Sequence, residues 1–325
     1  MFCEWKIEKS VPVISFLQEK IPLVLSESGD VSQTQVSNSK IRRLLVAGAV
    51  FVNGRQCRVP SLILRAGDKV RAEISMEKFF YEKQPDDIDF TLTEKDVLFE
   101  DDFLLVVNKP AFFPTEETIV KGRGNMHQAA VDYLWKKNPS LRNPPYVGIM
   151  HRLDRETSGT LLFTKSRSVN NAVHAMFENH TAVKKYRAVC AVKKSTPVKE
   201  GFFVENYIGR VSPKSARCKI GVLPESRGGQ FARTDFTLVK KSERMQSERY
   251  AYIDCTLLTG RTHQIRVHLS LSGLPIVGDE LYGGPVGFPE NNGRIMLHAF
   301  SLAFDHPVSG ERLEIVAPLP KGFSS

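Results

Sequence analysis

The feature that most constrains the fold of this chain is a long succession of short apolar runs after about residue 96. Helical spacing of apolar residues interrupts the series at 125–137, where Asn125 can cap the helix, and again at 169–178. Many strands with few helices between them predict an α+β domain with a mixed, largely antiparallel central sheet and flanking helices. The expected strands are 97–99, 103–107, 185–192, 232–239, 250–257, 262–269 and 299–304.

A smaller module precedes this domain. Residues 37–48 show the apolar spacing of a helix, and Asn53-Gly54 after a short apolar run is a strong hairpin signal. A further strand is expected at 69–74, and the charged stretch that follows predicts a linker. The expected division is a small α/β domain at 11–76, a linker at 77–95 and the larger domain at 96–319.

The charge of the chain points to a nucleic acid partner. Its 325 residues carry a formal net charge of +9, with a pI of about 9.3. Lysine and arginine displace counterions from phosphates, so nucleic acid commonly binds such a protein. Lys40, Arg42 and Arg43 lie off the apolar face of the predicted helix 37–48 and are expected to bind RNA. The alternative is an ordinary solvated helix face.

The remaining composition favours a cytoplasmic protein without a metal. The five cysteines are widely spaced and form no Cys-x-x-Cys pair, which indicates a reducing compartment. No apolar run is long enough to cross a bilayer, and the charged N-terminus is not a secretory signal. His263 and His268 lack metal-ligand spacing and would face opposite sides of the expected strand 262–269.

Residues 151–159, which read HRLDRETSG, carry the strongest chemical signal. Strand-like runs lie on both sides, at 147–150 and 160–164, so the carboxylate of Asp154 is expected on a tight, rigid loop. An aspartate is ionised at neutral pH, and carboxylate nucleophiles suit attack at an anomeric carbon, which a nucleoside also has. Asp154 is therefore a candidate nucleophile for glycosidic-bond chemistry on RNA.

Two other interpretations of Asp154 stay open on the residues alone. The side chain could form an Asx-turn or a surface ion pair with Arg152 or Arg155. It could instead act together with Glu156, because ordinary glycosidases use two carboxylates.

Three further strings accompany this one: KKYRA at 184–188, TGRTHQIRVHL at 259–269 and GLPIVGDELYG at 273–283. With HRLDRETSG they resemble the RluA-type family of RNA pseudouridine synthases. The resemblance implies that Asp154 attacks a flipped-out uridine, that Arg266 pairs with it, and that Tyr186 stacks on the base. It also implies that Ile265 and Leu269 wall the base pocket, and that Arg152 enters the vacated stack or holds the RNA backbone.

The resemblance covers residues 96–319, and residues 31–76 resemble the alpha-L (S-four type) RNA-binding domain. One stretch departs from the family pattern, the loop AFFPTEE at 111–117, which borders the site in the family. We therefore expect this loop to affect the choice of substrate.

The expected function is that of an RNA pseudouridine synthase, which needs no metal or other cofactor. Large-subunit ribosomal RNA is the first expected substrate and transfer RNA the second. Asp154 either attacks the anomeric carbon or removes a neighbouring proton. The rival functions are a non-catalytic RNA-binding or ribosome-assembly factor with the same fold, and a glycosidase or nucleosidase acting on small molecules. A monomer that binds no membrane is expected.

Overall fold

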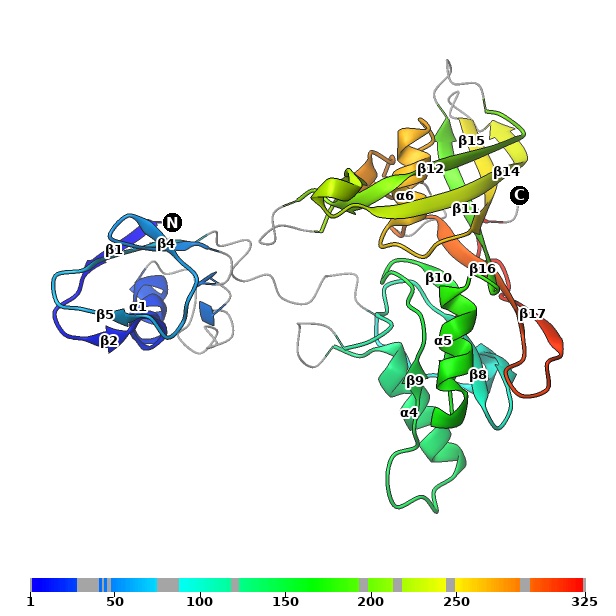
Figure 1. Ribbon diagram of the computed structural model, residues 1–325, viewed down its shortest axis with the longest axis horizontal. Helices are drawn as coiled ribbons and strands as arrows, with labels where there is room; N and C mark the ends of the chain where they lie inside the picture. Colours follow the sequence, from blue (N-terminus) through cyan, green and yellow to red (C-terminus); the bar gives the residue numbers. More distant parts are fainter. Residues whose placement is uncertain are drawn as a thin grey trace. The chain divides into compact units, whose positions relative to one another are not determined.

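The computed structural model describes residues 2–27, 41–42, 44–45, 48–74, 88–117, 123–192, 198–212, 218–243, 249–286 and 293–323. The chain divides into two compact units. The first lies within Met1–Gln84 and Ser212–Cys218, and the second within Pro85–Val211 and Lys219–Ser325. Both units can be followed along the chain by colour in Figure 1.

The first unit holds a four-stranded antiparallel sheet in the order β1-β6-β3-β4, with helix α1 (Val13–Glu27) packed in the same core. The Asn53-Gly54 hairpin is confirmed: Asn53 and Gly54 both have positive φ, at 50° and 78°, as a two-residue hairpin turn requires. The strands are β1 (Phe2–Lys6), β3 (Val50–Val52), β4 (Arg55–Cys57) and β6 (Lys69–Glu73), with a separate pair of β2 (Val11–Pro12) and β5 (Ile63–Leu64).

The boundaries of the units differ from the expected ones at two places. Strand β1 pairs with β6 along its whole length, so the first unit takes in residues before the expected start at residue 11. At the other end, Leu92 is buried in the core of the second unit, with a 3-10 turn η2 at Glu94–Asp96 after it. Apolar residues of the charged stretch therefore pack on the second unit.

The second unit is built on an eleven-stranded sheet in the order β13-β12-β14-β15-β11-β16-β10-β8-β7, with β17 beside β16 and β9 beside β10. The pairings are antiparallel except for β10 with β16, so the expected α+β class is confirmed among the described strands. The strands are β7 (Val97–Glu100), β8 (Leu104–Lys109), β9 (Gly148–Ile149), β10 (Ser158–Thr164), β11 (Val183–Val192), β12 (Gly201–Arg210), β13 (Ile220–Val222), β14 (Gln230–Glu243), β15 (Arg249–Leu257), β16 (Leu297–Asp305) and β17 (Arg312–Val316).

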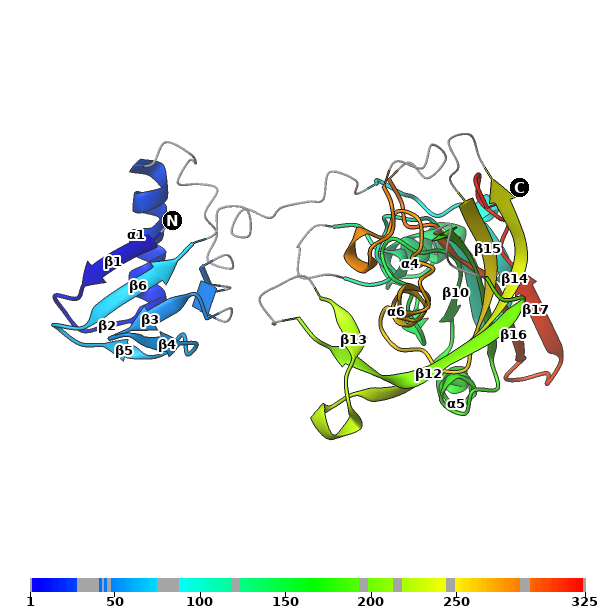
Figure 2. The same ribbon diagram turned by 90° about the horizontal axis from the view of Figure 1, so that it is seen from above.

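Two of the helices cover opposite faces of this sheet, as Figure 2 shows. Helix α4 (Met126–Lys137) shares a core with Leu105 and Val107 of β8, whereas α5 (Asn170–Glu178) shares one with Leu104 and Val106, because alternate residues of a strand face opposite sides. The predicted cap of α4 is confirmed, since Gln128 N–H donates to Asn125 Oδ1 at 3.0 Å. No helix among the described segments is long and apolar enough to cross a membrane.

The strand expected at 262–269 is wrong, because the chain forms helix α6 (Gln264–Leu271) there. The alternation of polar and apolar residues suggested a period of two, but this short helix is buried almost all round, so its polar residues also have buried partners. Gln264 and His268, four residues apart, both hydrogen-bond Thr234, at 2.9 Å each, while Arg266 contacts other residues. Arg266 therefore does not share a face with Gln264 and His268, as alternate residues of a strand would.

Candidate active site

The loop between β9 and β10 carries Asp154. A glycine at the start of β10, Gly159, determines the backbone conformation where this loop ends. Thr157 N–H donates to the Asp154 carbonyl at 3.1 Å and closes a tight turn. Gly159 has φ of 116°, and a Cβ there would lie 2.1 Å from the Ala299 carbonyl oxygen. Only glycine permits this conformation and this approach of β10 to β16. The Ser-Gly end of the signature string therefore has a steric cause.

A buried lysine ties this loop to the preceding strand. Lys109, the last residue of β8, is fully buried. Burial lowers the pKa of Lys109 to about 7, although the negative charges of Glu156 and Asp154 act in the opposite direction. Its Nζ donates hydrogen bonds to the carbonyl oxygens of Pro110 at 2.8 Å, Phe113 at 2.7 Å and Arg155 at 3.1 Å.

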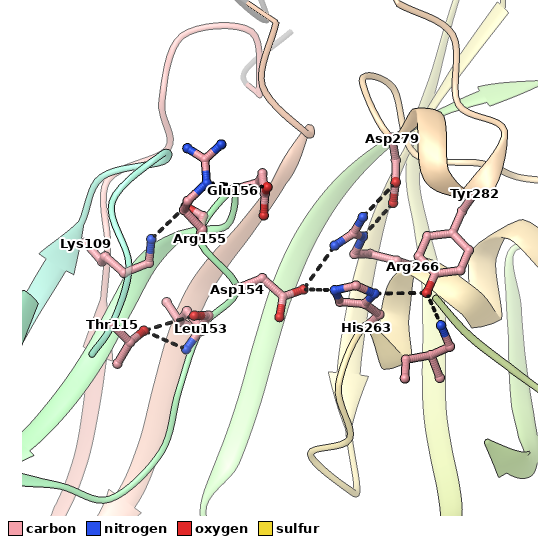
Figure 3. Close-up of polar contacts among 11 residues, drawn as sticks. Lys109, Thr115, Leu153, Asp154, Arg155, Glu156, His263, Arg266, Asp279 and Tyr282 are labelled. Carbon is pink, nitrogen blue, oxygen red and sulfur yellow. Dashed lines mark hydrogen bonds and ion pairs between the residues drawn. The ribbon is translucent and has the colours of Figure 1, made fainter. Parts of the chain in front are cut away.

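The unusual loop at 111–117 also holds the backbone next to Asp154. Thr115 Oγ1 donates to the Leu153 carbonyl at 2.9 Å and accepts from Leu153 N–H at 3.2 Å. Leu153 itself is buried in the core. Figure 3 shows these contacts on one side of Asp154, with its carboxylate directed toward the opposite wall. The loop thus helps to hold the candidate nucleophile from behind.

Arg266 lies across from this loop, within hydrogen-bonding distance of the Asp154 carboxylate. Its guanidinium binds Asp279 through two hydrogen bonds, at 2.7 and 2.9 Å, and donates a third to Asp154 Oδ2 at 3.4 Å. The side chains of Arg266 and Asp279 are 2% and 1% exposed, against 27% for Asp154. Burial lowers the pKa of Arg266, but the hydrogen bonds and charge of Asp279 outweigh it and raise that pKa overall. A permanent cation therefore faces the carboxylate.

His263 is a site residue that the sequence analysis missed. Its Nε2 lies 3.8 Å from Asp154 Oδ2, and its Nδ1 lies 2.9 Å from the Tyr282 hydroxyl, which accepts a bond from Ile220 N–H. Burial lowers the pKa of His263, with Asp154 acting in the opposite direction, which favours a neutral ring. With its proton on Nε2, the ring accepts from Tyr282 and points an N–H at Asp154 (Figure 3).

Several of these groups line one cleft of about 840 Å³. Asp154, Tyr186, Arg266 and Ile265 all face it. Tyr186 lies on β11 and is 8% exposed; burial, and then the charge of Asp154, raise the pKa of its phenol, so the ring stays neutral. Leu269, which was expected in the pocket wall, is instead fully buried in the core and is not among the lining residues, because the chain is helical there.

The other candidate residues fall in different places. Arg152 lines the cleft, is 70% exposed and forms an ion pair with Glu116. Glu156, the rival second carboxylate, is not among the lining residues and lies 3.7 Å from Arg155. Arg42 is exposed in the first unit, whereas Lys40 and Arg43 lie outside the described residues.

The cleft can therefore offer one carboxylate to a substrate, fixed by a buried cation on one side and a backbone clamp on the other. A carboxylate so held is able to act as a nucleophile or a base. The neighbouring tyrosine ring is neutral and largely apolar, which suits a planar base.

Comparisons with known proteins show the family of this chain. Residues 103–271, more than half of the chain, match the family model described as RNA pseudouridylate synthase. An RNA pseudouridine synthase of Synechocystis is 32% identical over 292 residues, covering 89% of this chain and 83% of that protein. The ribosomal large subunit pseudouridine synthase D of Neisseria meningitidis is 33% identical over 295 residues, covering 87% and 72%.

A solved structure supports the fold. The human RNA pseudouridylate synthase domain containing 4 superposes with a TM-score of 0.55 at 24% identity, covering 70% of this chain and 90% of that one.

A further sequence relative is the ribosomal large subunit pseudouridine synthase C of Pasteurella multocida. It is 34% identical over 305 residues, covering 87% of this chain and 83% of that protein. The family expected from the signature strings is therefore confirmed, and the chain belongs to the RluA-type family of RNA pseudouridine synthases.

Proposed function

We propose that this enzyme converts uridines of large-subunit ribosomal RNA to pseudouridine, with Asp154 as the nucleophile. The observation that carries the proposal is the position of Asp154: its carboxylate is partly exposed in the cleft, 3.4 Å from the buried guanidinium of Arg266. Two of the similar proteins, from Neisseria meningitidis and Pasteurella multocida, are named as ribosomal large subunit pseudouridine synthases, which supports this substrate.

The chemistry begins with a uridine that leaves its stack and enters the cleft. Unstacking costs a few kcal/mol, and contact with the ring of Tyr186 offsets part of that cost. Ile265 contributes apolar wall beside it, and Arg152 at the rim holds the RNA backbone or fills the vacated space. Leu269 has no role in this proposal, since it is buried away from the cleft.

The bond between the anomeric carbon and N1 of the uracil then breaks. Asp154 either attacks the anomeric carbon and forms an ester, or removes a proton from the neighbouring sugar carbon. The detached uracil turns and bonds to the anomeric carbon through C5. In the first route this bond displaces the carboxylate; in the second route the carboxyl group returns its proton to the neighbouring sugar carbon. In both routes C5 then loses its proton and N1 gains one. Substrate and product have the same atoms, so the reaction is an isomerisation and consumes no co-substrate.

The first unit supplies a second RNA contact in this proposal, as an S-four type domain. Arg42 is exposed there, and Lys40 and Arg43 are its neighbours in the sequence. The net charge of +9 favours binding to a polyanion. An enzyme of this class meets its ribosomal substrate in the cytoplasm.

The test is a transcriptome-wide map of pseudouridine in cells that carry the gene, lack it, or express the Asp154→Asn variant. The proposal expects one or a few positions in large-subunit ribosomal RNA that are modified only with the wild-type gene. Positions confined to transfer RNA would reject the proposed substrate. Identical maps in all three strains would instead favour a binding factor without catalysis.

A further inference from the structure

The cationic side chains that line the cleft are not all matched by carboxylates. Each carboxylate there has a partner: Glu116 pairs with Arg152, Asp154 with Arg266, and Glu178 with His174 at 3.5 Å. Lys184 and Arg261 also line the cleft, and neither forms an ion pair with a carboxylate in the part of the chain that the structure describes. Two cationic side chains therefore line the cleft without a carboxylate partner among the described residues.

Lys184 stands beside the base-binding face. It lies two residues before Tyr186 on β11, so both side chains point to the same side of the sheet, roughly 7 Å apart along the strand. Its ammonium is 5.8 Å from the centre of the Phe177 ring on α5. A methyl group placed on Gly260 would lie 3.2 Å from Lys184 Nζ, so the glycine leaves room for the ammonium at the cleft wall.

Arg261 is held at the exposed edge of the same wall. Its Nε donates to the Phe231 carbonyl at 3.0 Å, and its backbone N–H donates to Gln264 Oε1 at 3.0 Å. These bonds fix the stem of the side chain. Among the described residues no carboxylate pairs with the end of the guanidinium. Burial, and then the charge of Arg261, lower the pKa of Lys184, so the two cations lie within electrostatic reach of each other.

Two nearby cations, one of them partly buried, repel each other, and an anion bound between them offsets this repulsion. An RNA strand brings such an anion with the substrate, because each nucleotide carries a phosphate on either side of its sugar. Arginine binds phosphate through two nitrogens and lysine binds it as a point charge, so the two are complementary ligands.

We propose that Lys184 and Arg261 bind the backbone phosphate next to the target uridine, and that this contact sets the sugar over Asp154 while Tyr186 holds the base. The inference rests on the proposed function for the identity of the nucleotide, but the phosphate contact itself depends only on RNA entering the cleft.

The test measures the affinity of the full-length protein for a short single-stranded oligouridylate over a range of salt concentrations. Lys184→Met keeps the apolar stem and removes the charge; we expect affinity about tenfold lower, and a slope of log affinity against log salt smaller by about 0.7, as for one lost phosphate contact. Lys184→Arg should restore both. Lys185→Met is the matched control. Lys185 is the next residue of β11 and is exposed on the other face of the sheet, so its substitution should change neither value.

A wild-type slope in Lys184→Met, or an equal change in Lys185→Met, would overturn the phosphate site. Arg261→Gln, at the exposed rim, gives a second chance to refute it without disturbing the core, and should lower the slope by a similar amount. A wild-type protein that modifies no RNA would remove the proposed function, yet the salt slopes would still decide the phosphate site. Conversely, normal modification with unchanged slopes would remove only the phosphate site.

Discussion

The arrangement around Arg266 allows its structural and chemical roles to be separated. Arg266→Met would leave the carboxylate of Asp279, which is 1% exposed, buried without its two hydrogen bonds of 2.7 and 2.9 Å. Removing one partner of a buried ion pair costs about 3–5 kcal/mol, most of it from the charge left behind. The same change removes the cation beside Asp154, so the variant should lose both stability and pseudouridine formation.

A second variant tests which charge causes the loss. In Arg266→Met with Asp279→Leu no charge of the buried pair remains, and apolar replacements of a buried pair are often close to neutral. We expect most of the 3–5 kcal/mol to return while activity stays absent, because Asp154 still lacks its guanidinium. Stability of the second unit can be followed in urea by the fluorescence of Trp135 on α4 in a Trp5→Phe background, since the chain has two tryptophans.

A double variant as unstable as the single one would show that the buried charge of Asp279 is not the cause of the loss. A double variant that regains activity would show that Arg266 is dispensable for the carboxylate of Asp154. Wild-type stability in the single variant would contradict the burial of the pair.

Three further predictions follow from single features of the site. Tyr186→Leu, which keeps an apolar side chain but removes the flat ring, should lower kcat/KM for pseudouridine formation by about ten- to hundredfold through lost stacking, and a wild-type value would contradict that role. Lys109→Met should lower kcat at least about tenfold with RNA affinity little changed, because three carbonyl oxygens around the Asp154 loop lose their donor; single-turnover assays with a binding titration would check it. Burial lowers the pKa of His151 and His298 to about 3 and of His268 to about 4, below the ordinary 6.5. The unfolded chain therefore binds more protons than the folded one, and the free energy of unfolding should fall as pH drops from 6.5 towards 4, by up to about 1.4 kcal/mol per pH unit per histidine. Urea titrations that show no such fall would refute this prediction.

Local chemistry allowed much of the fold to be predicted. The Asn53-Gly54 turn, the Asn125 cap and the apolar strands depend on interactions between near neighbours, so they were readable from the sequence. Helix α6 was not, because its burial on nearly all sides removed the period that distinguishes a helix from a strand.

The site itself shows the same division. Asp154 and Arg266 are 112 residues apart, and no periodicity could bring them together; the expected pairing came from family resemblance. His263 was missed because its role depends on a left-handed backbone with φ of 53° and on Tyr282, neither visible in its spacing. Lys109 was missed because its acceptors are backbone carbonyls, which carry no side-chain signal.

The central claim is that the carboxylate of Asp154 performs the chemistry while other groups bind the RNA. The most direct measurement counts the pseudouridines formed per molecule of a ribosomal RNA fragment that contains the target uridine, under single turnover, for wild type and Asp154→Asn. The affinity of each protein for that fragment is measured alongside. We expect complete conversion by wild type, none by the variant, and affinities within about twofold, since the change removes no positive charge. Pseudouridine formed by Asp154→Asn above background would contradict it.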